Sequence, residues 1–123
     1  MKGLRTAANE ALDSMKTGEE ILTMGTVSQK DPEINKYWIQ FGARRIAKKI
    51  PNRLIFSDPG PHFMNTKNRP LIKVRYLPSI TPATVDVFGD DKIIIFNYEK
   101  PITSILIYDK NIAQSFKQFF EQL

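Results

Sequence analysis

The sequence predicts a single layered α/β domain in which helices flank a mixed β-sheet, with the element order αβαβ, then ββββ, then α. Two observations predict this class. In the first half, apolar residues at helical spacing alternate with short β-type stretches, which is typical of parallel strands joined by right-handed crossovers. Over residues 83–108, β-type stretches are separated only by turns. The sheet is therefore expected to be parallel at its start and antiparallel over that segment.

Composition sets limits on the kind of protein this is. The chain has 123 residues, of which 41% are apolar and 25% charged, as in an ordinary globular domain, here spanning residues 1–123. It has no cysteine and one histidine, which excludes thiolate metal sites, thiol nucleophiles and histidine-rich centres. We therefore expect no metal and no cofactor. Without a signal-peptide core or a bilayer-length apolar run, we expect a soluble cytoplasmic protein with no membrane partner.

The first half of the chain contains two predicted helices, each followed by a short buried strand. An alanine-rich apolar stripe predicts a helix over residues 2–16, and an apolar stretch then predicts a strand over residues 20–24. Asp31 suits a helix N-cap, so a second helix is expected from there to about Lys49. A second buried strand is predicted over residues 53–57.

The second predicted helix carries two apolar stripes on roughly opposite faces. The first contains Ile34, Tyr37, Trp38 and Phe41. The second contains Ala43, Ile46, Ala47 and Ile50. At 100° per residue these stripes do not join. The helix is therefore expected to contact two different neighbours or to bend near Gly42.

The second half begins with a long predicted loop over residues 58–70, a length that more often marks function or mobility than a simple connection. Alternation and apolar runs then predict four strands, over residues 71–77, 83–88, 92–97 and 102–108. Polar residues 89–91 predict a hairpin turn. A last helix is expected after an N-cap at Asp109 or Asn111, with one narrow apolar stripe.

A small-molecule site is predicted beyond the carboxyl ends of the two parallel strands, where open α/β sheets bind their ligands. The candidate ligand-binding residues are Gly25, Thr26, Ser57, Asp58 and His62. His62, the single histidine, is more simply a solvent-exposed loop residue than a general base. Asp86 lies in a predicted strand, and its pattern leaves open whether it faces solvent or a ligand.

A basic cluster accounts for much of the net charge of +5. It consists of Arg44, Arg45, Lys48, Lys49 and Arg53. Next to three aromatic residues, such a cluster could bind phosphates and stack bases. A solvated helix face, with the aromatics forming core or a subunit contact, is the favoured interpretation. The candidate interface or partner residues are Tyr37, Trp38, Phe41, Arg45 and Lys49.

The order of several segments resembles the C-terminal region of TrmB-like archaeal transcriptional regulators. They are Ile72-Lys-Val-Arg-Tyr-Leu-Pro78, Thr81-Pro-Ala-Thr84, Phe88-Gly-Asp90, Ile105-Leu-Ile-Tyr-Asp-Lys110 and Ile112-Ala-Gln-Ser-Phe-Lys-Gln-Phe-Phe120. The resemblance implies a phospholipase D-like fold and an effector sensor, which binds sugars in such proteins. In these regulators a separate winged-helix domain contacts DNA, and the present chain contains no such segment.

The resemblance also bears on catalysis. Phospholipase D enzymes carry a His-x-Lys-x4-Asp signature, whereas His62 is followed by Phe63 and Met64. The expected function is therefore a non-catalytic ligand-sensing and oligomerisation domain of a transcriptional regulator, which forms a homo-oligomer and binds a small-molecule effector such as a sugar. Two alternatives stay open: a phospholipase D-type phosphodiesterase, and a nucleic-acid-binding module that uses the basic helix at residues 44–53.

Overall fold

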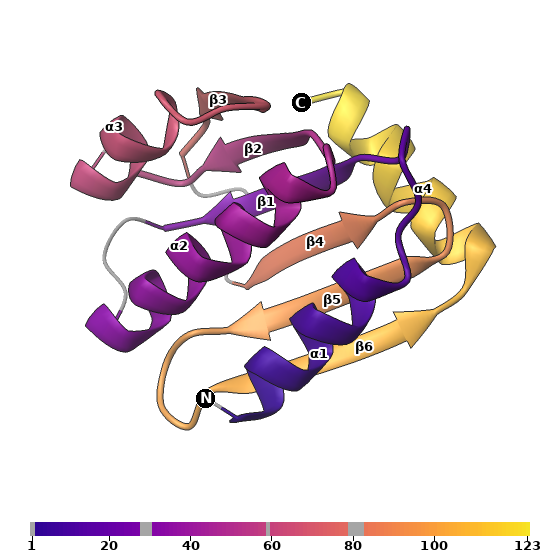
Figure 1. Cartoon of the computed structure of the whole chain (residues 1–123), viewed down its shortest axis with the longest axis horizontal. Coiled ribbons are helices and arrows are strands. Elements are labelled where there is room, and N and C mark those ends of the chain that lie inside the picture. Colours follow the sequence, from indigo (N-terminus) through magenta and orange to yellow (C-terminus); the bar gives the residue numbers. More distant parts are fainter. Residues whose placement is uncertain (1, 28–30, 59, 79–82) are drawn as a thin grey trace.

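Six strands form one mixed sheet, with helices on both of its faces (Figure 1). The computed structural model describes residues 2–27, 31–58, 60–78 and 83–123. The elements are, in order, α1 (Lys2–Asp13), β1 (Ile21–Thr26), α2 (Pro32–Ala47), β2 (Asn52–Phe56), α3 (Pro61–Thr66), β3 (Ile72–Tyr76), β4 (Thr84–Phe88), β5 (Lys92–Asn97), β6 (Thr103–Tyr108) and α4 (Lys110–Glu121).

The strand order across the sheet is β3-β2-β1-β4-β5-β6. β1, β2 and β3 are parallel, whereas β4, β5 and β6 follow as an antiparallel meander that joins the parallel part where β4 pairs with β1. The predicted α/β class and the mixed sheet are thus confirmed. β1 runs two residues further than expected, because a register shift between Met24 and Thr26 lets the strand continue past Gly25, whose φ is +77°.

Each face of the sheet has its own apolar core. α1 and α2 cover one face, where Leu4, Phe41 and Phe96 are among the buried side chains. α4 covers the other face and inserts Ala113 and Phe120 against β1, β4 and β5. Because β4 lies between two helix-covered faces, all five of its residues are buried, including the polar ones that alternate with its valines. The polar face of β4 therefore points toward α2 and away from solvent.

The prediction of a loop over residues 58–70 is wrong in one respect, because this segment contains the short helix α3. Pro61 occupies the first helical position, where its missing N–H costs nothing. Just before it, the Asp58 carboxylate accepts a hydrogen bond from the Gly60 backbone N–H at 3.3 Å. The observed order is therefore αβαβαββββα, one helix more than the sequence predicts.

α2 also differs from the prediction, because it buries one continuous face. Its inner stripe runs through Tyr37 and Phe41 and ends in Arg45, which is only 2% exposed. Ala43 and Ala47, which belong to the second predicted stripe, are exposed. A charged residue thus occupies the last inner position of the face that Tyr37 and Phe41 begin. As predicted, Asp31 caps the helix, and its carboxylate accepts from the Glu33 N–H at 2.9 Å.

The C-terminus of α1 is held by basic side chains at the C-terminal end of α2, one in its last turn and one at its C-cap. The Lys48 ammonium donates to the carbonyl oxygens of Leu12 at 2.6 Å and of Asp13 at 3.2 Å in the last turn of α1, and the Leu12 carbonyl also accepts from the Met15 backbone N–H at 3.0 Å. The Arg44 guanidinium lies 3.9 Å from the Asp13 carboxylate and also donates to the Asn9 side chain. Two positive charges therefore stabilise the negative end of the α1 dipole.

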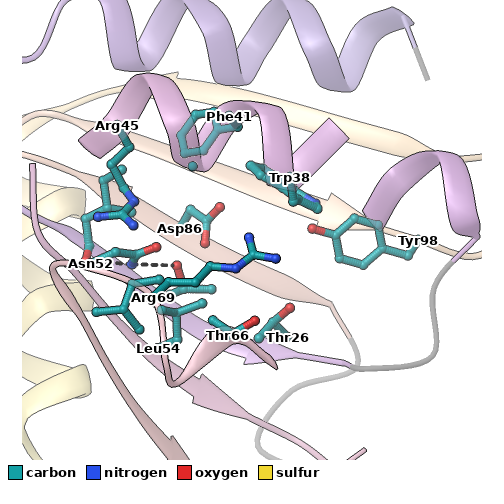
Figure 2. A pocket seen from close by; sticks show the side chains of 14 residues that line it. Thr26, Trp38, Phe41, Arg45, Asn52, Leu54, Thr66, Arg69, Asp86 and Tyr98 are labelled. Atoms are coloured by element: carbon teal, nitrogen blue, oxygen red, sulfur yellow. Dashed lines mark hydrogen bonds between the residues drawn. The ribbon is translucent and has the colours of Figure 1, made fainter. Parts of the chain in front are cut away.

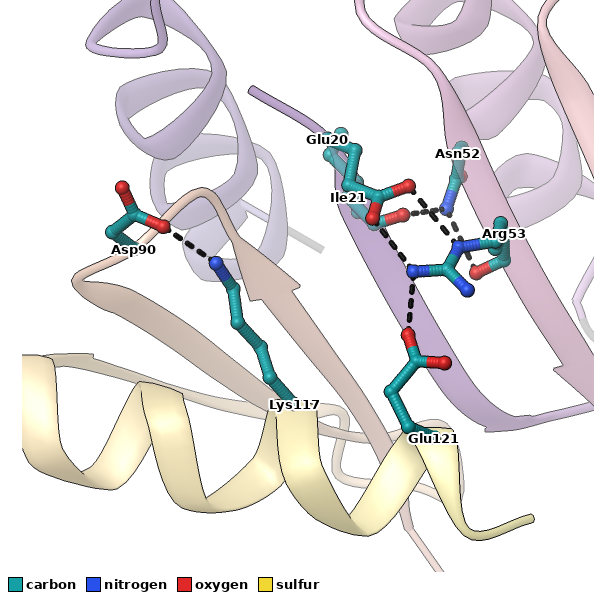
Figure 3. Close-up of polar contacts among 7 residues, drawn as sticks. All are labelled: Glu20, Ile21, Asn52, Arg53, Asp90, Lys117 and Glu121. Carbon is teal, nitrogen blue, oxygen red and sulfur yellow. Dashed lines mark hydrogen bonds and ion pairs between the residues drawn. The ribbon is translucent and has the colours of Figure 1, made fainter. Parts of the chain in front are cut away.

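A second charged group connects the sheet to α4 (Figure 3). The Arg53 guanidinium on β2 pairs with Glu20 at 2.7 Å and with Glu121 at 2.7 Å, and it lies over the Phe120 ring, 5.2 Å from its centroid. On the same side, Lys117 pairs with Asp90 of the β4–β5 turn at 2.6 Å. These contacts fix the C-terminal half of α4 against the sheet.

The α1 cap can be tested with neighbouring lysines. We expect Lys48→Met to lower the free energy of unfolding by about 1 kcal/mol, because two carbonyls lose a charged donor. Lys49→Met is the matched control, because Lys49 is exposed one residue further along the chain. Urea unfolding followed by circular dichroism measures both variants. Equal stability of the two would contradict this role of Lys48.

Candidate functional site

A cavity of about 70 Å³ lies between α2 and the sheet. The segment that contains α3 closes one side of it (Figure 2). Side chains from β1, α2, β2, α3, β3 and β4 contribute to its wall, so it lies where the parallel part of the sheet meets the meander. The lining residues are Ile21, Thr23, Thr26, Trp38, Phe41, Gly42, Arg45, Asn52, Leu54, Thr66, Arg69, Ile72, Asp86 and Tyr98.

Arg45 forms one wall of the cavity and is fixed by backbone groups. Its guanidinium donates to the carbonyl oxygens of Ile50 at 2.7 Å, Leu71 at 3.3 Å and Pro70 at 3.2 Å. Burial, together with the positive charge of Arg69, lowers the pKa of Arg45 to about 10. Its charge is therefore held close to the cavity at an energetic cost, which the three carbonyls partly offset.

Asp86 contributes a buried carboxylate. The residue is 4% exposed and lies on the face of β4 that points toward α2 (Figure 2). Burial, and next to it the Asp86 carboxylate, raise the pKa of the Tyr98 phenol well above its usual value. Tyr98 therefore stays a neutral hydroxyl at the cavity and can donate a hydrogen bond there.

Two further polar side chains line the cavity, and they differ in whether they already have hydrogen-bond partners. The Asn52 amide nitrogen donates to the Ile21 carbonyl at 2.9 Å and to the Thr23 hydroxyl at 3.2 Å, so it is already occupied. Thr66 is 5% exposed, and its hydroxyl oxygen has no hydrogen-bond partner within the described residues. A buried hydroxyl without a partner costs free energy, and a bound molecule could supply that partner.

Arg69 reaches across the cavity from the segment after α3 (Figure 2). It is half-buried, and its backbone N–H donates to the Thr66 carbonyl at 3.1 Å. In the part of the chain that the structure describes, its guanidinium has neither a hydrogen bond nor an ion pair. The Arg69 Nη1 atom lies beside Gly42 of α2, 3.8 Å from where a Cβ would stand at that position, which is an ordinary van der Waals distance. Arg69 therefore presents unspent donors to the cavity.

The five predicted ligand-binding residues are only partly brought together. Thr26 lines the cavity, and its carbonyl accepts from the Ser57 N–H at 2.8 Å, so the two strand ends meet as expected. Gly25 contributes its carbonyl to Thr84 at 3.2 Å, and Asp58 begins the turn into α3; neither lines the cavity. The backbone of His62 lies in α3, while its side chain is outside the described residues.

The five predicted interface residues lie mostly inside the domain. Tyr37 and Phe41 are 4% and 5% exposed and pack edge-on or tilted against neighbouring rings. Trp38 is half-buried against the same core, and Arg45 is fully enclosed. The interpretation of these four as an exposed contact face is therefore corrected: they form core and cavity wall. Lys49 alone of the five is exposed.

Four of the five cations of the basic cluster are engaged within the domain. Arg44 and Lys48 hold the end of α1, Arg45 binds carbonyls, and Arg53 pairs with Glu20 and Glu121. A groove for nucleic acid would need these cations free to face phosphates. Their contacts therefore give no support to the nucleic-acid alternative.

Several lining residues were missed at the sequence level. Asn52, Thr66 and Arg69 carry no motif and sit next to apolar strands or within the predicted loop. Asp86 was the exception, because the sequence offered a reason to examine it. It is a carboxylate in a strand of alternating polar and apolar residues, and the neighbouring turns place that strand inside a meander. A strand paired on both edges and covered on both faces buries such a residue, and burial of a carboxylate is a functional signal.

Comparisons of the chain with protein-family models, with curated proteins and with solved structures found no match. Within the described residues, no group of three or more metal-ligating side chains could hold a metal ion. No helix in the described ranges is long and apolar enough to cross a membrane.

Substitution of two buried threonines tests whether the Thr66 hydroxyl lacks a hydrogen-bond partner. We expect Thr66→Val to raise the free energy of unfolding by about 1 kcal/mol, because the substitution removes a desolvated hydroxyl without breaking a hydrogen bond. Thr84→Val is the control, because the Thr84 hydroxyl donates to the Gly25 carbonyl, and its loss should lower stability. Denaturant unfolding measures both. Destabilisation by Thr66→Val would show that its hydroxyl is already satisfied.

The free energy of unfolding is also expected to fall at alkaline pH, because of the ionisation of Tyr37. Burial raises the pKa of Tyr37 to about 12, against the opposing charges of Arg44 and Arg5. Between pH 10 and 12 the unfolded chain loses this proton while the folded chain keeps it, so the contribution is complete below pH 10 and is lost toward pH 12. Tyr37→Phe should reduce that decline by on the order of 2 kcal/mol. Urea unfolding at pH 9 to 12 measures it, and identical slopes for both proteins would contradict it.

Proposed function

We propose that this chain is a non-catalytic ligand-sensing and oligomerisation domain of a transcriptional regulator, similar to the phospholipase D-like effector domains of TrmB-like regulators. The effector binds in the cavity between α2 and the sheet. The resemblance of the sequence segments supports the class of protein. The cavity supports the sensing role and carries the proposal.

The observation on which the proposal rests is the set of polar groups enclosed around this cavity. A domain of this size gains most stability by filling such a space with apolar side chains. Here Arg45 at 2% exposure, Asp86 at 4% and Thr66 at 5% surround it instead. Buried charges that cost stability are typical of sites retained for binding. Convergence of polar groups on one small space therefore favours a polar ligand.

The position of the cavity suits a sensor. Its wall combines residues of the sheet with residues of α2 and of the α3 segment, so a ligand that contacts all of them would link elements that otherwise share few contacts. Such a ligand stabilises one arrangement of these elements over another. In an oligomer, that preference would pass to the attached DNA-binding domains.

The same site gives less support to the phosphodiesterase alternative. Arg45, the most enclosed cation, already donates to three carbonyls, which leaves it fewer N–H groups to offer a transferring phosphate. The other groups that line the cavity are suited to hydrogen-bond hydroxyl and charged groups of a ligand.

Ligand screening tests the sensing role. Sugars, nucleotides and small metabolites would be added to the protein while the melting temperature and the tryptophan fluorescence are recorded. Trp38 is the single tryptophan and lines the cavity, so its emission reports on this site. A ligand present at a hundred times its Kd should stabilise the fold by about 2.7 kcal/mol, a shift of several degrees.

A matched pair of variants locates the binding. Asp86→Asn should remove the response to any compound found, because it removes the buried carboxylate of the cavity. Asp90→Asn, in the exposed β4–β5 turn, should leave the response intact. A screen in which no compound changes either signal would overturn the proposal. So would a ligand whose binding is unaffected by Asp86→Asn.

A further inference from the structure

We infer that the effector is a small hydroxylated monocarboxylate of the three-carbon hydroxy-acid class, held between Arg69 and Asp86. This inference rests on the proposed function, because it names the ligand class for the same cavity. Three observations carry it: the balance of charge around the cavity, the groups whose hydrogen-bonding capacity is unspent, and the size of the space.

Charge balance calls for one negative charge on the ligand. Of the described side chains that line the cavity, Arg45 and Arg69 are cationic and Asp86 is anionic when ionised. The surroundings therefore carry one net positive charge, and the two guanidiniums are close enough for Arg69 to lower the pKa of Arg45. A monoanion neutralises the enclosed space, which is the condition under which buried charge is least costly.

The two arginines differ in what they can offer a ligand. Arg45 uses three of its five N–H donors on the carbonyls of Ile50, Leu71 and Pro70. Arg69 has no such partners within the described residues. A guanidinium binds a carboxylate through two parallel hydrogen bonds, a geometry that a flat carboxylate matches and that an ammonium could not supply. The carboxylate of the ligand is therefore assigned to Arg69.

A hydroxyl on the ligand suits the opposite side of the cavity. The Asp86 carboxylate can accept a hydrogen bond, and the buried Thr66 hydroxyl can donate or accept one. An alcohol O–H both donates and accepts, so it can serve these two groups without adding charge. An ammonium in its place would make the ligand a zwitterion with no net charge, and the positive balance of the site would then remain.

The volume of the cavity limits the size of the ligand. A single water needs about 10–15 Å³ of such space, so about 70 Å³ has room for roughly five to seven atoms of that size. A three-carbon acid with one or two hydroxyls has that number of heavy atoms. A disaccharide is several times larger than this space. A phosphorylated sugar would also bring a second negative charge.

The ligand class is tested by comparing the binding of D-glycerate with that of four related compounds. Calorimetry and Trp38 fluorescence would compare D-glycerate with L-lactate, with glycerol, which lacks the carboxylate, with propionate, which lacks the hydroxyl, and with L-serine, the corresponding zwitterion. We expect saturable binding of glycerate or lactate, and at least tenfold weaker binding of the other three. Glycerol, propionate or L-serine binding as tightly as the best hydroxy acid would overturn the assignment.

Variants of the α3 segment test the assigned contacts. Arg69→Gln should weaken binding of the hydroxy acid at least tenfold, Arg69→Lys should weaken it less because the charge remains, and Thr66→Val should weaken it several-fold. Lys67→Gln, at an exposed position of the same segment, is the control and should leave the Kd unchanged. Circular dichroism and melting curves establish that each variant is folded. Unchanged affinity in Arg69→Gln would overturn the inference.

The failure of this inference can be told from failure of the proposed function. If another compound in the broader screen binds and changes Trp38 emission while hydroxy acids do not, the ligand class is wrong and the sensing role stands. If no compound of any class binds at the cavity, both are wrong. If a hydroxy acid binds but does so equally in Asp86→Asn and Arg69→Gln, the cavity is not its site.

Discussion

The buried guanidinium of Arg45 is the interaction on which the arrangement of the parallel half depends. It joins the end of α2 to the residues just before β2 and β3 through three carbonyl oxygens. Without these carbonyls the buried charge would have no partner, whereas the Leu71 carbonyl would keep its hydrogen bond from the Asn52 backbone N–H at 2.9 Å. The geometry of α2 over the sheet, and with it the space above Asp86, therefore follows from this one side chain.

Cations serve as structural connectors throughout the domain. Lys48 holds the end of α1, and Arg53 joins β2 to the loop before β1 and to α4. Arg69 differs from these, because its guanidinium lies at the cavity without a partner in the described part of the chain. The net charge of +5 thus says little about partners until each cation is placed. Once the cations with structural contacts are set aside, the positive charge that could bind a ligand is the one at the cavity.

Much of the fold could be predicted from the sequence, because it depends on local signals. Caps such as Asp31 and Asp109, and the alternation of the strands, identify elements within a few residues of their observed ends. The helix α3 was missed because its six residues show no apolar periodicity. The site was harder, because it depends on pairing between distant strands: only the position of β4 beside β1 makes Asp86 interior, and only α2's inner face makes Arg45 part of the same wall.

The position of β1 at the centre of the sheet has a consequence for how the chain acquires its structure. β1 needs β4 as its antiparallel neighbour, and the chain reaches β4 only after β2, α3 and β3 have been made. Until then, one long edge of the parallel half has unpaired backbone groups, which are open to pairing with another chain. Such late, distant pairing slows folding. During synthesis, the growing chain is therefore most prone to aggregation just before residues 84–88 emerge.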